Sequence, residues 1–548
     1  FFHPPPATPD PLWSRGLGDV YKRQIYMVRI CIVGGGSAGW MTAAAFRKIF
    51  PDYKIDLIES QTLPKMSVGE STLGHFNRYL DLIEVQDHEW MPACNATYKV
   101  SIQFSNWKGT DDVFQYPFGD TDYTDGGLVD WYHIHNLYPD EFPDNTFAEF
   151  YNPISYLAQT NRVSDPKEYI RNFNPKWNRA YHFDSDKFGA WLRNNRCQEV
   201  GHYYDDIVKC TYDTKCNIDK LIGAGGTEYE ADYYIDCTGF ASKLLGGMMG
   251  TPWIDFPFLP NDSAIAARIP YENRREQMIN TTDGHAMPEG WVWTIPLWNR
   301  IGKGYVYSSQ QHRDDPETIF REHLGTRGKP YEGDVQHIKF MHGRRQNAWV
   351  RNVIGIGLSQ GFLEPLESTG LFTTHENIIR LVDVFQRRDG FVSQLDIDGY
   401  NHTVNFELEA MKEFIEIHYY LSPRCDTAYW RQFHENAPLS EDELQDKIVR
   451  SPRLYQELIH CWNISNAPSG LGGTTYIAAG LGYHPATPAT TRYVLNRDEY
   501  SISEAKESIG RYRHYKKTVL EYLEKQPVHY DYLLKNIYGN DESFEFIS

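Results

Sequence analysis

A glycine-rich turn near the start of the chain constrains the fold more than any other feature of the sequence. The residues Gly34-Gly35-Gly36-Ser37-Ala38-Gly39 read GxGxxG, and they follow an apolar run from Val28 to Val33. A helix-compatible stretch comes next and ends at Pro51, and a second apolar run covers Ile55 to Ile58. A buried strand, a glycine turn, a helix and a second strand form a βαβ unit. The sequence therefore predicts a Rossmann-like α/β domain.

Each glycine of the motif has its own physical role. Gly34 permits the tight turn, Gly36 lets the backbone approach a pyrophosphate, and Gly39 lets helix and strand pack closely. Glu59, at the end of the second strand, is placed to accept hydrogen bonds from a ribose. An acid at this position disfavours NADP and leaves FAD and NAD open. The alternative is a plain glycine turn in an α/β sheet.

The composition excludes several classes of function. Hydrophobic residues make up 41% of the 548 residues, as in an ordinary globular protein, and the net charge is −19. Binding to a phosphate backbone needs clustered Lys and Arg, so we expect no nucleic-acid partner. No stretch approaches the ~20 apolar residues of a membrane span, and we expect a cytoplasmic protein. The 8 cysteines stand singly, so we expect no metal site.

Three parts follow one another along the chain. Residues 1–26 lack the apolar segment of a signal peptide, and RGLGDVYKRQ within them resembles translated adapter sequence, so we expect a non-native or disordered tail and a natural start at Met27. Residues 27–375 should form the dinucleotide-binding domain with mixed sheets and inserted substrate-contacting segments. Residues 376–548 read mainly helical; Ile509, Tyr512, Val519 and Leu523 recur there at helical spacing.

Two short apolar runs in the middle of the chain alternate like strands. In Tyr98–Phe104 the alternation places Lys99 on the polar face, where a solvent-exposed lysine is the common case. In Trp291–Leu297 it places Trp291 and Trp293 on one face, until Pro296 ends the run. Taken alone, these are two core tryptophans.

The glycine turn and the motif WVWTIP together resemble the flavin-dependent halogenases, particularly those that act on tryptophan and other indoles. Further matching segments occur in the family order: VGESTLGHF (Val68–Phe76), CNATYKVSIQFSNW (Cys94–Trp107), QYPFGD (Gln115–Asp120), RAYHFDSDKFGAWLR (Arg179–Arg193), GLSQGFLEPLESTG (Gly357–Gly370), HYYLSPRCDTAYW (His418–Trp430) and GLGYHP (Gly480–Pro485). The resemblance implies an FAD-binding domain of the FAD monooxygenase type with a helix-rich substrate region.

The resemblance also implies an activity. FADH2 from a separate flavin reductase, oxygen, and chloride or bromide would yield hypohalous acid, which passes to a lysine and halogenates an electron-rich aromatic ring, expected to be an indole. A homodimer is a possible assembly. Two alternatives remain open: an FAD-dependent aromatic hydroxylase, which would consume NAD(P)H itself, and a flavin-binding protein without catalysis.

The family pattern assigns roles to individual residues. Lys99 matches the catalytic lysine, and Glu367 matches the glutamate that steadies the cationic ring and assists its deprotonation. Thr369 and Gly370 match the halide loop. The residues expected to contact the flavin are Gly34, Gly36, Ser37, Ala38, Gly39, Glu59, Val68, Gly69, Glu70 and Leu358. The residues expected to line the substrate pocket are Tyr116, Phe118, Trp291, Trp293 and Ser368.

The sequence departs from the family in the substrate region. Tyr116 stands where tryptophan-specific members carry a histidine. The segment GTTYIAAGLG (Gly473–Gly482) has Thr474 and Thr475 in place of the paired tyrosines near the polar end of the amino acid. We therefore expect weak or no turnover of free tryptophan and better turnover of indoles that lack the amino-acid tail; free indole, another indole derivative and a phenol-like ring stay open as substrates.

Overall fold

The computed structural model describes residues 27–61, 69–109, 111–119, 128–165, 173–311, 314–326, 328–435, 470–484, 488–495 and 502–539. The tail 1–26, Val68 and Pro485 lie outside these residues. No helix in the described ranges is both long enough and apolar enough to cross a bilayer. All seven cysteines that fall in these ranges are free thiols.

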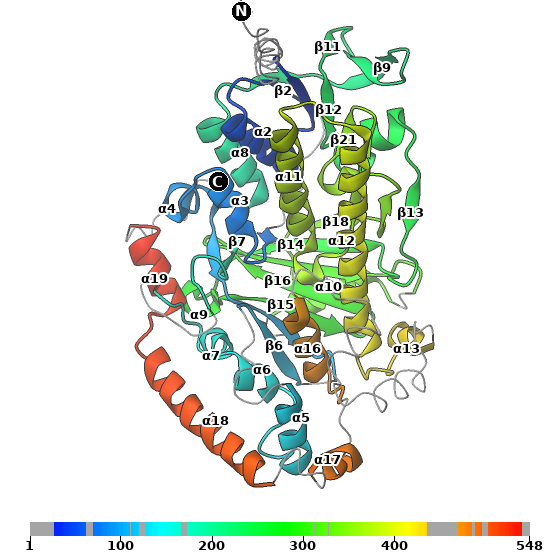
Figure 1. Ribbon diagram of the computed structural model, residues 1–548. Coiled ribbons are helices and arrows are strands. Elements are labelled where there is room, and N and C mark those ends of the chain that lie inside the picture. The colour runs from blue at the N-terminus through cyan, green and yellow to red at the C-terminus, as the bar shows by residue number, and fades with distance from the viewer. Residues whose placement is uncertain are drawn as a thin grey trace, which may run out of the picture.

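The βαβ unit expected from the glycine turn is confirmed. Strand β1 pairs in parallel with β2 and β12 in a six-stranded sheet, and α2 packs against α8 and α11 (Figure 1). The strands in spatial order are β20 (Trp349–Val350), β21 (Val353–Gly355), β12 (Tyr233–Asp236), β1 (Arg29–Val33), β2 (Lys54–Glu59) and β8 (Gly201–Tyr204). The helices are α2 (Ser37–Ile49), α8 (Ser185–Arg196) and α11 (Thr369–Arg388).

A seven-stranded mixed sheet forms the middle of the molecule. Its order is β18 (Val335–Lys339), β14 (Ser263–Ile269), β17 (Ile301–Tyr307), β16 (Gly290–Pro296), β15 (Thr281–Met287), β5 (Ser101–Ser105) and β6 (Val113–Pro117). Only β15 and β5 pair in parallel; the other neighbours are antiparallel. Trp291 and Trp293 join one core cluster and Val292 another, so the expected alternation along β16 is confirmed.

Three small sheets complete the strands. The first, which carries Lys99, has the order β3 (Glu70–Ser71), β7 (Ala180–Phe183), β4 (Thr97–Lys99). The others are β11 (Glu228–Glu230), β10 (Ile218–Gly223), β9 (Ile207–Tyr212), and β13 (Trp253–Asp255), β19 (Gly343–Arg345), β22 (Gly361–Phe362).

The expectation of one strand over Tyr98–Phe104 is wrong. The chain leaves the small sheet after β4 and enters the seven-stranded sheet at β5, with Val100 between them. The amide of Val100 donates to the carbonyl oxygen of Asn280, just before β15. Two sheets therefore share this stretch, and Lys99 points into the protein with 0% of its surface exposed instead of facing solvent.

The later part of the chain is mainly helical in the described ranges, as predicted. Helices α11 and α12 run side by side in Figure 1, and the long α18 borders α5 and α7 at the opposite end from the βαβ unit. Ile509, Tyr512 and Leu523 of α18 are buried, as their spacing predicts. Helix α11 continues unbroken across residues 375 and 376, so the domain boundary placed there falls inside a helix, and that division stays a prediction.

The remaining helices are α3 (Phe76–Leu82), α4 (Asp87–Trp90), α5 (Leu128–Leu137), α6 (Thr146–Tyr151), α7 (Ile154–Gln159), α9 (Arg274–Gln277), α10 (Pro316–Leu324), α12 (Gln394–Tyr420), α13 (Ala428–Glu435), α16 (Gly470–Gly480), α17 (Pro488–Leu495), α18 (Ile502–Leu523) and α19 (His529–Asn536).

Candidate active site

The glycine-rich turn has the geometry of a dinucleotide-binding loop. Gly34 has φ +118°, and a Cβ atom on Gly39 would lie 1.9 Å from the carbonyl oxygen of Gly34, so α2 approaches the turn only because both are glycine. A Cβ atom on Gly36 would meet no heavy atom within 4 Å. This open space lies beside the backbone of Ser37 and Ala38 at the N-terminus of α2, and it fits a pyrophosphate.

Two segments distant in sequence lie against this turn. Glu59 ends β2 with 4% of its surface exposed, and its Oε1 lies 2.8 Å from Nε2 of His202. Leu358 belongs to the helical turn Gly357–Ser359, whose first residue approaches Ala38 of α2. These positions support the expected flavin site, although the individual flavin contacts stay a prediction.

Glu70, at the start of β3, has a carboxyl group with a raised pKa. Gly69 precedes the strand with φ +92°, and Glu70 begins it. Burial, together with the carboxylates of Asp186 and Asp184, raises the pKa of Glu70 to about 7. Glu70 can therefore hold or release a proton near neutral pH.

Lys99 ends β4 and is fully buried. The acceptors of its Nζ are Ser71 Oγ at 2.9 Å, Ser368 Oγ at 2.9 Å and the carbonyl oxygen of Thr72 at 3.1 Å. Burial lowers the pKa of Lys99 to about 7, and the nearby Glu367 opposes this shift. The amine is thus held in place by three acceptors, yet near neutral pH it can exist in both of its protonation states.

Glu367 forms a buried pair with a histidine of α12. Its Oε1 lies 2.8 Å from Nε2 of His418, and each side chain is 1% exposed. Nδ1 of His418 lies 2.7 Å from the carbonyl oxygen of Phe414, which can only accept, so Nδ1 carries a proton. The second carboxylate oxygen, Oε2, is buried and has no hydrogen-bond partner in the described part of the chain.

The N-terminus of α11 lies next to this pair in the chain. The helix begins at Thr369, and its first N–H groups have no acceptor within the helix. A Cβ atom on Gly370 would meet nothing within 4 Å, so there is room for an anion. The Thr369 hydroxyl donates to two preceding carbonyl oxygens at 2.9 and 3.1 Å, which fixes the loop. Ser368, at φ 57°, accepts a hydrogen bond from Nζ of Lys99 and donates its own proton to Oγ of Ser71 at 3.1 Å.

Aromatic rings lie next to the end of Lys99. The ring centroid of Phe118 is 5.0 Å from Nζ. Tyr116 on β6 lies 6.1 Å from Phe118 and 5.9 Å from Tyr476 on α16, measured between ring centroids. Phe414 lies 6.3 Å from Tyr116. Of the expected pocket residues, Phe118 therefore lies beside the lysine, and Tyr116 lies beside Phe118.

The tryptophan pair of β16 is packed in the core. The ring centroids of Trp291 and Trp293 are 6.2 Å apart, and Nε1 of Trp291 donates to Oε2 of Glu364 at 3.3 Å. A Cβ atom on Gly304 would come within 1.9 Å of the Trp293 ring, so the second ring fits only over a glycine. The position of this pair beside the flavin stays a prediction.

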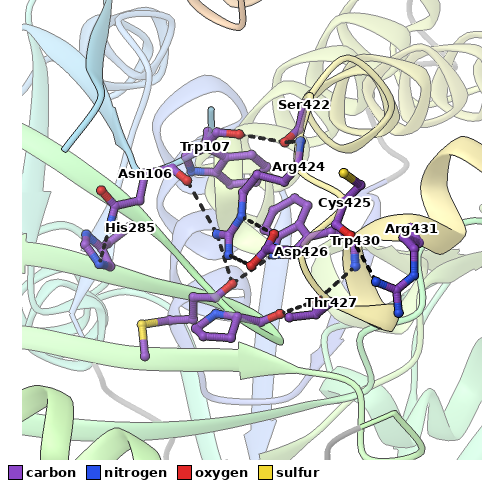
Figure 2. A network of polar contacts seen from close by, with 12 residues as sticks. Asn106, Trp107, His285, Ser422, Arg424, Cys425, Asp426, Thr427, Trp430 and Arg431 are labelled. Carbon is purple, nitrogen blue, oxygen red and sulfur yellow. Dashed lines mark hydrogen bonds and ion pairs between the residues drawn. The ribbon is translucent and has the colours of Figure 1, made fainter. Parts of the chain in front are cut away.

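A polar network fixes the segment that follows His418 (Figure 2). The hydroxyl of Ser422 donates to the carbonyl oxygen of Trp107 at 2.6 Å. Arg424 donates to the carbonyl oxygen of Met287 at 3.2 Å, and its guanidinium lies 4.6 Å from the ring centroid of Trp430. These contacts attach the segment that follows α12 to the central sheet.

Sequence reasoning missed three residues near the lysine. Ser71, His418 and Tyr476 all lie in segments compared with the family, but no pattern singles them out. Their importance depends on partners far away in the chain; for His418 that partner, Glu367, is 51 residues distant. For His418, a signal would have been a polar residue beside the apolar positions of a long predicted helix.

In the described ranges, one group of metal-ligand types comes together: His135, Asp144 and His484. The two imidazole rings are stacked, with centroids 4.2 Å apart and an interplanar angle of 7°. The nitrogen lone pairs lie in these two nearly parallel ring planes, so they do not converge on one point. Lys108 already pairs with Asp144. We assign no metal to this group, and the prediction of no metal site stays a prediction.

Comparison with known proteins gives a consistent answer. Residues 29–488 match the family model described as Tryptophan halogenase. The 7-chloro-L-tryptophan 6-halogenase KtzR of Kutzneria sp. (strain 744) is 33% identical over 459 residues, which cover 79% of this chain and 84% of that protein.

Solved structures agree over most of the chain. VirX1 in its apo form is 42% identical with a TM-score of 0.84, covering 94% of this chain and 100% of that one. Xcc4156, a flavin-dependent halogenase from Xanthomonas campestris, is 27% identical with a TM-score of 0.79, covering 93% of this chain and 98% of that one. The expected fold is confirmed, and the chain belongs to the tryptophan halogenase family and is a flavin-dependent halogenase, an enzyme that uses flavin and halide.

Proposed function

We propose that this halogenase chlorinates or brominates an electron-rich aromatic ring, in the first instance an indole, with hypohalous acid that reaches Lys99. FAD, supplied as FADH2 by a separate flavin reductase, provides this oxidant with oxygen and the halide. The observation that carries the proposal is the buried amine of Lys99, held by three acceptors beside the ring of Phe118. We assign the halide to the N–H groups at Thr369 and Gly370.

Both protonation states of Lys99 have a use. As an ammonium, Nζ donates a hydrogen bond to the oxygen of hypohalous acid and makes the halogen more electrophilic. As an amine, Nζ attacks the halogen: the N–X bond forms, the O–X bond breaks, and the departing hydroxide takes a proton from the nitrogen and leaves as water. In either form the halogen is held at one place, which gives regiocontrol.

Glu367 is assigned to the ring that is being halogenated. A carbon attacked by the halogen leaves a cationic ring, which must lose a proton to recover aromaticity. Oε2 of Glu367 has no hydrogen-bond partner within the described ranges and is therefore available to this cation. Oε1 is engaged with His418, which holds the carboxylate in place so that Oε2 can take the proton from the ring.

The substrate pocket favours rings without an amino-acid tail. A buried ammonium–carboxylate end needs polar partners. Tyr116 packs among aromatic rings, and Thr474, a neutral hydroxyl buried on α16, has no hydrogen-bond partner among the described residues. We expect indole and its simple derivatives to be turned over at least 10-fold better than free tryptophan by kcat/KM, about 1.4 kcal/mol in transition-state binding. Competition between the two, read by mass spectrometry, measures the ratio; a preference for tryptophan contradicts this assignment.

The mechanism is tested by separating flavin oxidation from halogen transfer. Lys99→Ala, supplied with a generic flavin reductase and bromide, should reoxidise flavin at the wild-type rate but lose halogenated product by at least 10³-fold, about 4 kcal/mol. Lys99→Arg should fail as well, because a guanidinium does not readily form a haloamine. Glu367→Gln should lose less, since it keeps its shape.

Stopped-flow absorbance and product mass analysis on the same samples give both readouts. The matched control is Lys303→Ala, because Lys303 also has a pKa lowered by burial but lies in β17, among other neighbours. Halogenated product from Lys99→Ala at the wild-type rate contradicts the proposal. Oxygenated product that survives the change would instead indicate the aromatic hydroxylase.

A further inference from the structure

The small sheet β3–β7–β4 places His182 between the lysine strand and its neighbour. In the antiparallel register His182 lies opposite Ser71 of β3 and opposite Thr97 of β4. Lys99 lies opposite Ala180, whose single methyl group leaves space for the long side chain to cross the sheet to Ser71. These five residues are all buried.

A chain of hydrogen bonds runs from Lys99 through this sheet to a backbone carbonyl. Its links are Lys99 Nζ to Ser71 Oγ at 2.9 Å, Ser71 Oγ to Thr282 Oγ1 at 2.8 Å, Thr282 Oγ1 to His182 Nε2 at 2.8 Å, His182 Nδ1 to Thr97 Oγ1 at 3.3 Å, and Thr97 Oγ1 to the Pro296 carbonyl oxygen at 2.6 Å.

The direction of donation along this chain of hydrogen bonds can be determined from its end at Pro296. The carbonyl oxygen of Pro296 can only accept, so Thr97 donates its one hydroxyl proton there. Thr97 must then accept from Nδ1–H of His182. Burial and the nearby Lys99 and His529 lower the pKa of His182 well below its usual value, so the ring is neutral and Nε2 can only accept.

The remaining links follow in turn. Thr282 donates its proton to Nε2 of His182, so its oxygen must accept from Ser71. The Ser71 proton is thereby used, and its oxygen presents a lone pair to Nζ of Lys99. Every group in the chain therefore accepts from the side of Lys99 and donates away from it.

We propose that His182 is a positioning residue for Lys99: its ring fixes the direction of the hydrogen-bond chain, so that Ser71 accepts from the amine and favours its charged, donating form. This inference rests on the role proposed above for Lys99. It extends that role to a residue that touches neither the substrate nor the lysine directly.

Removal of the His182 ring would leave the hydroxyls of Thr282 and Ser71 without a fixed orientation. Without Nε2, the hydroxyls of Thr282 and Ser71 can rotate, and Ser71 can donate to the neutral amine, which favours deprotonation. The other charged or titratable groups that face these residues are Glu367, beside Lys99, and His529, beside His182. Neither is changed by a substitution at position 182, so the shift can be attributed to the chain.

The test measures the protonation of Lys99 directly and does not measure a reaction product. Protein labelled with carbon-13 at lysine Cε is titrated by NMR, and the Lys99 signal is identified by its loss in Lys99→Met. His182→Phe should lower the titration midpoint of Lys99 by roughly one pH unit. His182→Gln, whose amide oxygen can accept from Thr282, should restore much of the wild-type midpoint.

Thr282→Val provides an independent break in the chain if His182→Phe does not fold. It removes one hydroxyl, keeps the ring, and should lower the midpoint in the same direction. The matched control is Thr251→Val, because the Thr251 hydroxyl is buried but has no hydrogen-bond partner in the structure. An unchanged Lys99 midpoint in His182→Phe or Thr282→Val overturns the inference. Since no halogenated product is measured, failure of the proposed activity would not affect this result.

Discussion

Burial lowers the pKa of Lys99 to about 7, because a charged amine is poorly solvated inside the protein. In the unfolded chain the same group keeps its proton up to about pH 10.5. Between these values the unfolded state binds more protons, so the free energy of unfolding rises with pH through this window. The buried lysine thus destabilises the fold most at and below neutral pH.

Replacement of Lys99 by methionine should therefore stabilise the protein. Relative to wild type, Lys99→Met should have the higher free energy of unfolding at pH 6, and the difference should shrink by roughly 3 kcal/mol by pH 9.5. Urea unfolding at the two pH values measures this. Lys215→Met, at an exposed position, is the control and should show no such trend. A difference that stays constant with pH would mean that Lys99 titrates normally.

At the scale of single elements, the glycine turn offers a matched pair of substitutions. Gly36→Ala adds a methyl group where nothing lies within 4 Å, whereas Gly39→Ala adds one 1.9 Å from a carbonyl oxygen. Gly36→Ala should leave the melting temperature of the flavin-free protein unchanged and weaken FAD binding at least 10-fold. Gly39→Ala should destabilise the flavin-free protein by about 1–3 kcal/mol.

Calorimetry without flavin and fluorescence titration with FAD distinguish the two effects. Equal loss of stability in both variants would mean that the space beside Gly36 is needed for folding and is not the pyrophosphate site.

Some elements of this fold can be predicted from the sequence, and others cannot. The βαβ unit follows from local patterns, because strand, turn and helix signals all lie within Val28–Glu59. The break at Val100 does not, since it depends on pairing with Asn280 and β15, far away in the chain. The position of Lys99 came from the family resemblance, and its burial became apparent only once two sheets were seen to meet there.

At the scale of the whole molecule, buried histidines make the fold sensitive to acid. Burial lowers the pKa of His133, His323 and His529 to about 4 in each case. The unfolded chain takes up these protons near pH 6.5, so stability is lost as the pH falls from about 6.5 towards 4.

His529 provides the test of this acid sensitivity. It lies on α19 and accepts from the Tyr98 amide at 3.2 Å, which connects the C-terminal helix to the lysine strand. Between pH 7 and pH 4.5, wild type should lose roughly 2–3 kcal/mol more than His529→Leu. Guanidinium unfolding of both proteins across this range checks the difference; parallel curves would exclude His529 as a source of acid lability.

The parallel pairing of β5 with β15 also has a consequence for biosynthesis. The β5–β6 hairpin leaves the ribosome early, while the strand that pairs with its inner edge, beginning at Thr281, is translated only after more than half of the α/β part has been made. Until then the hairpin exposes an unsatisfied strand edge, a feature that favours aggregation of nascent chains. We expect β5, the strand that follows the lysine strand, to stay unprotected until β15 has been synthesised.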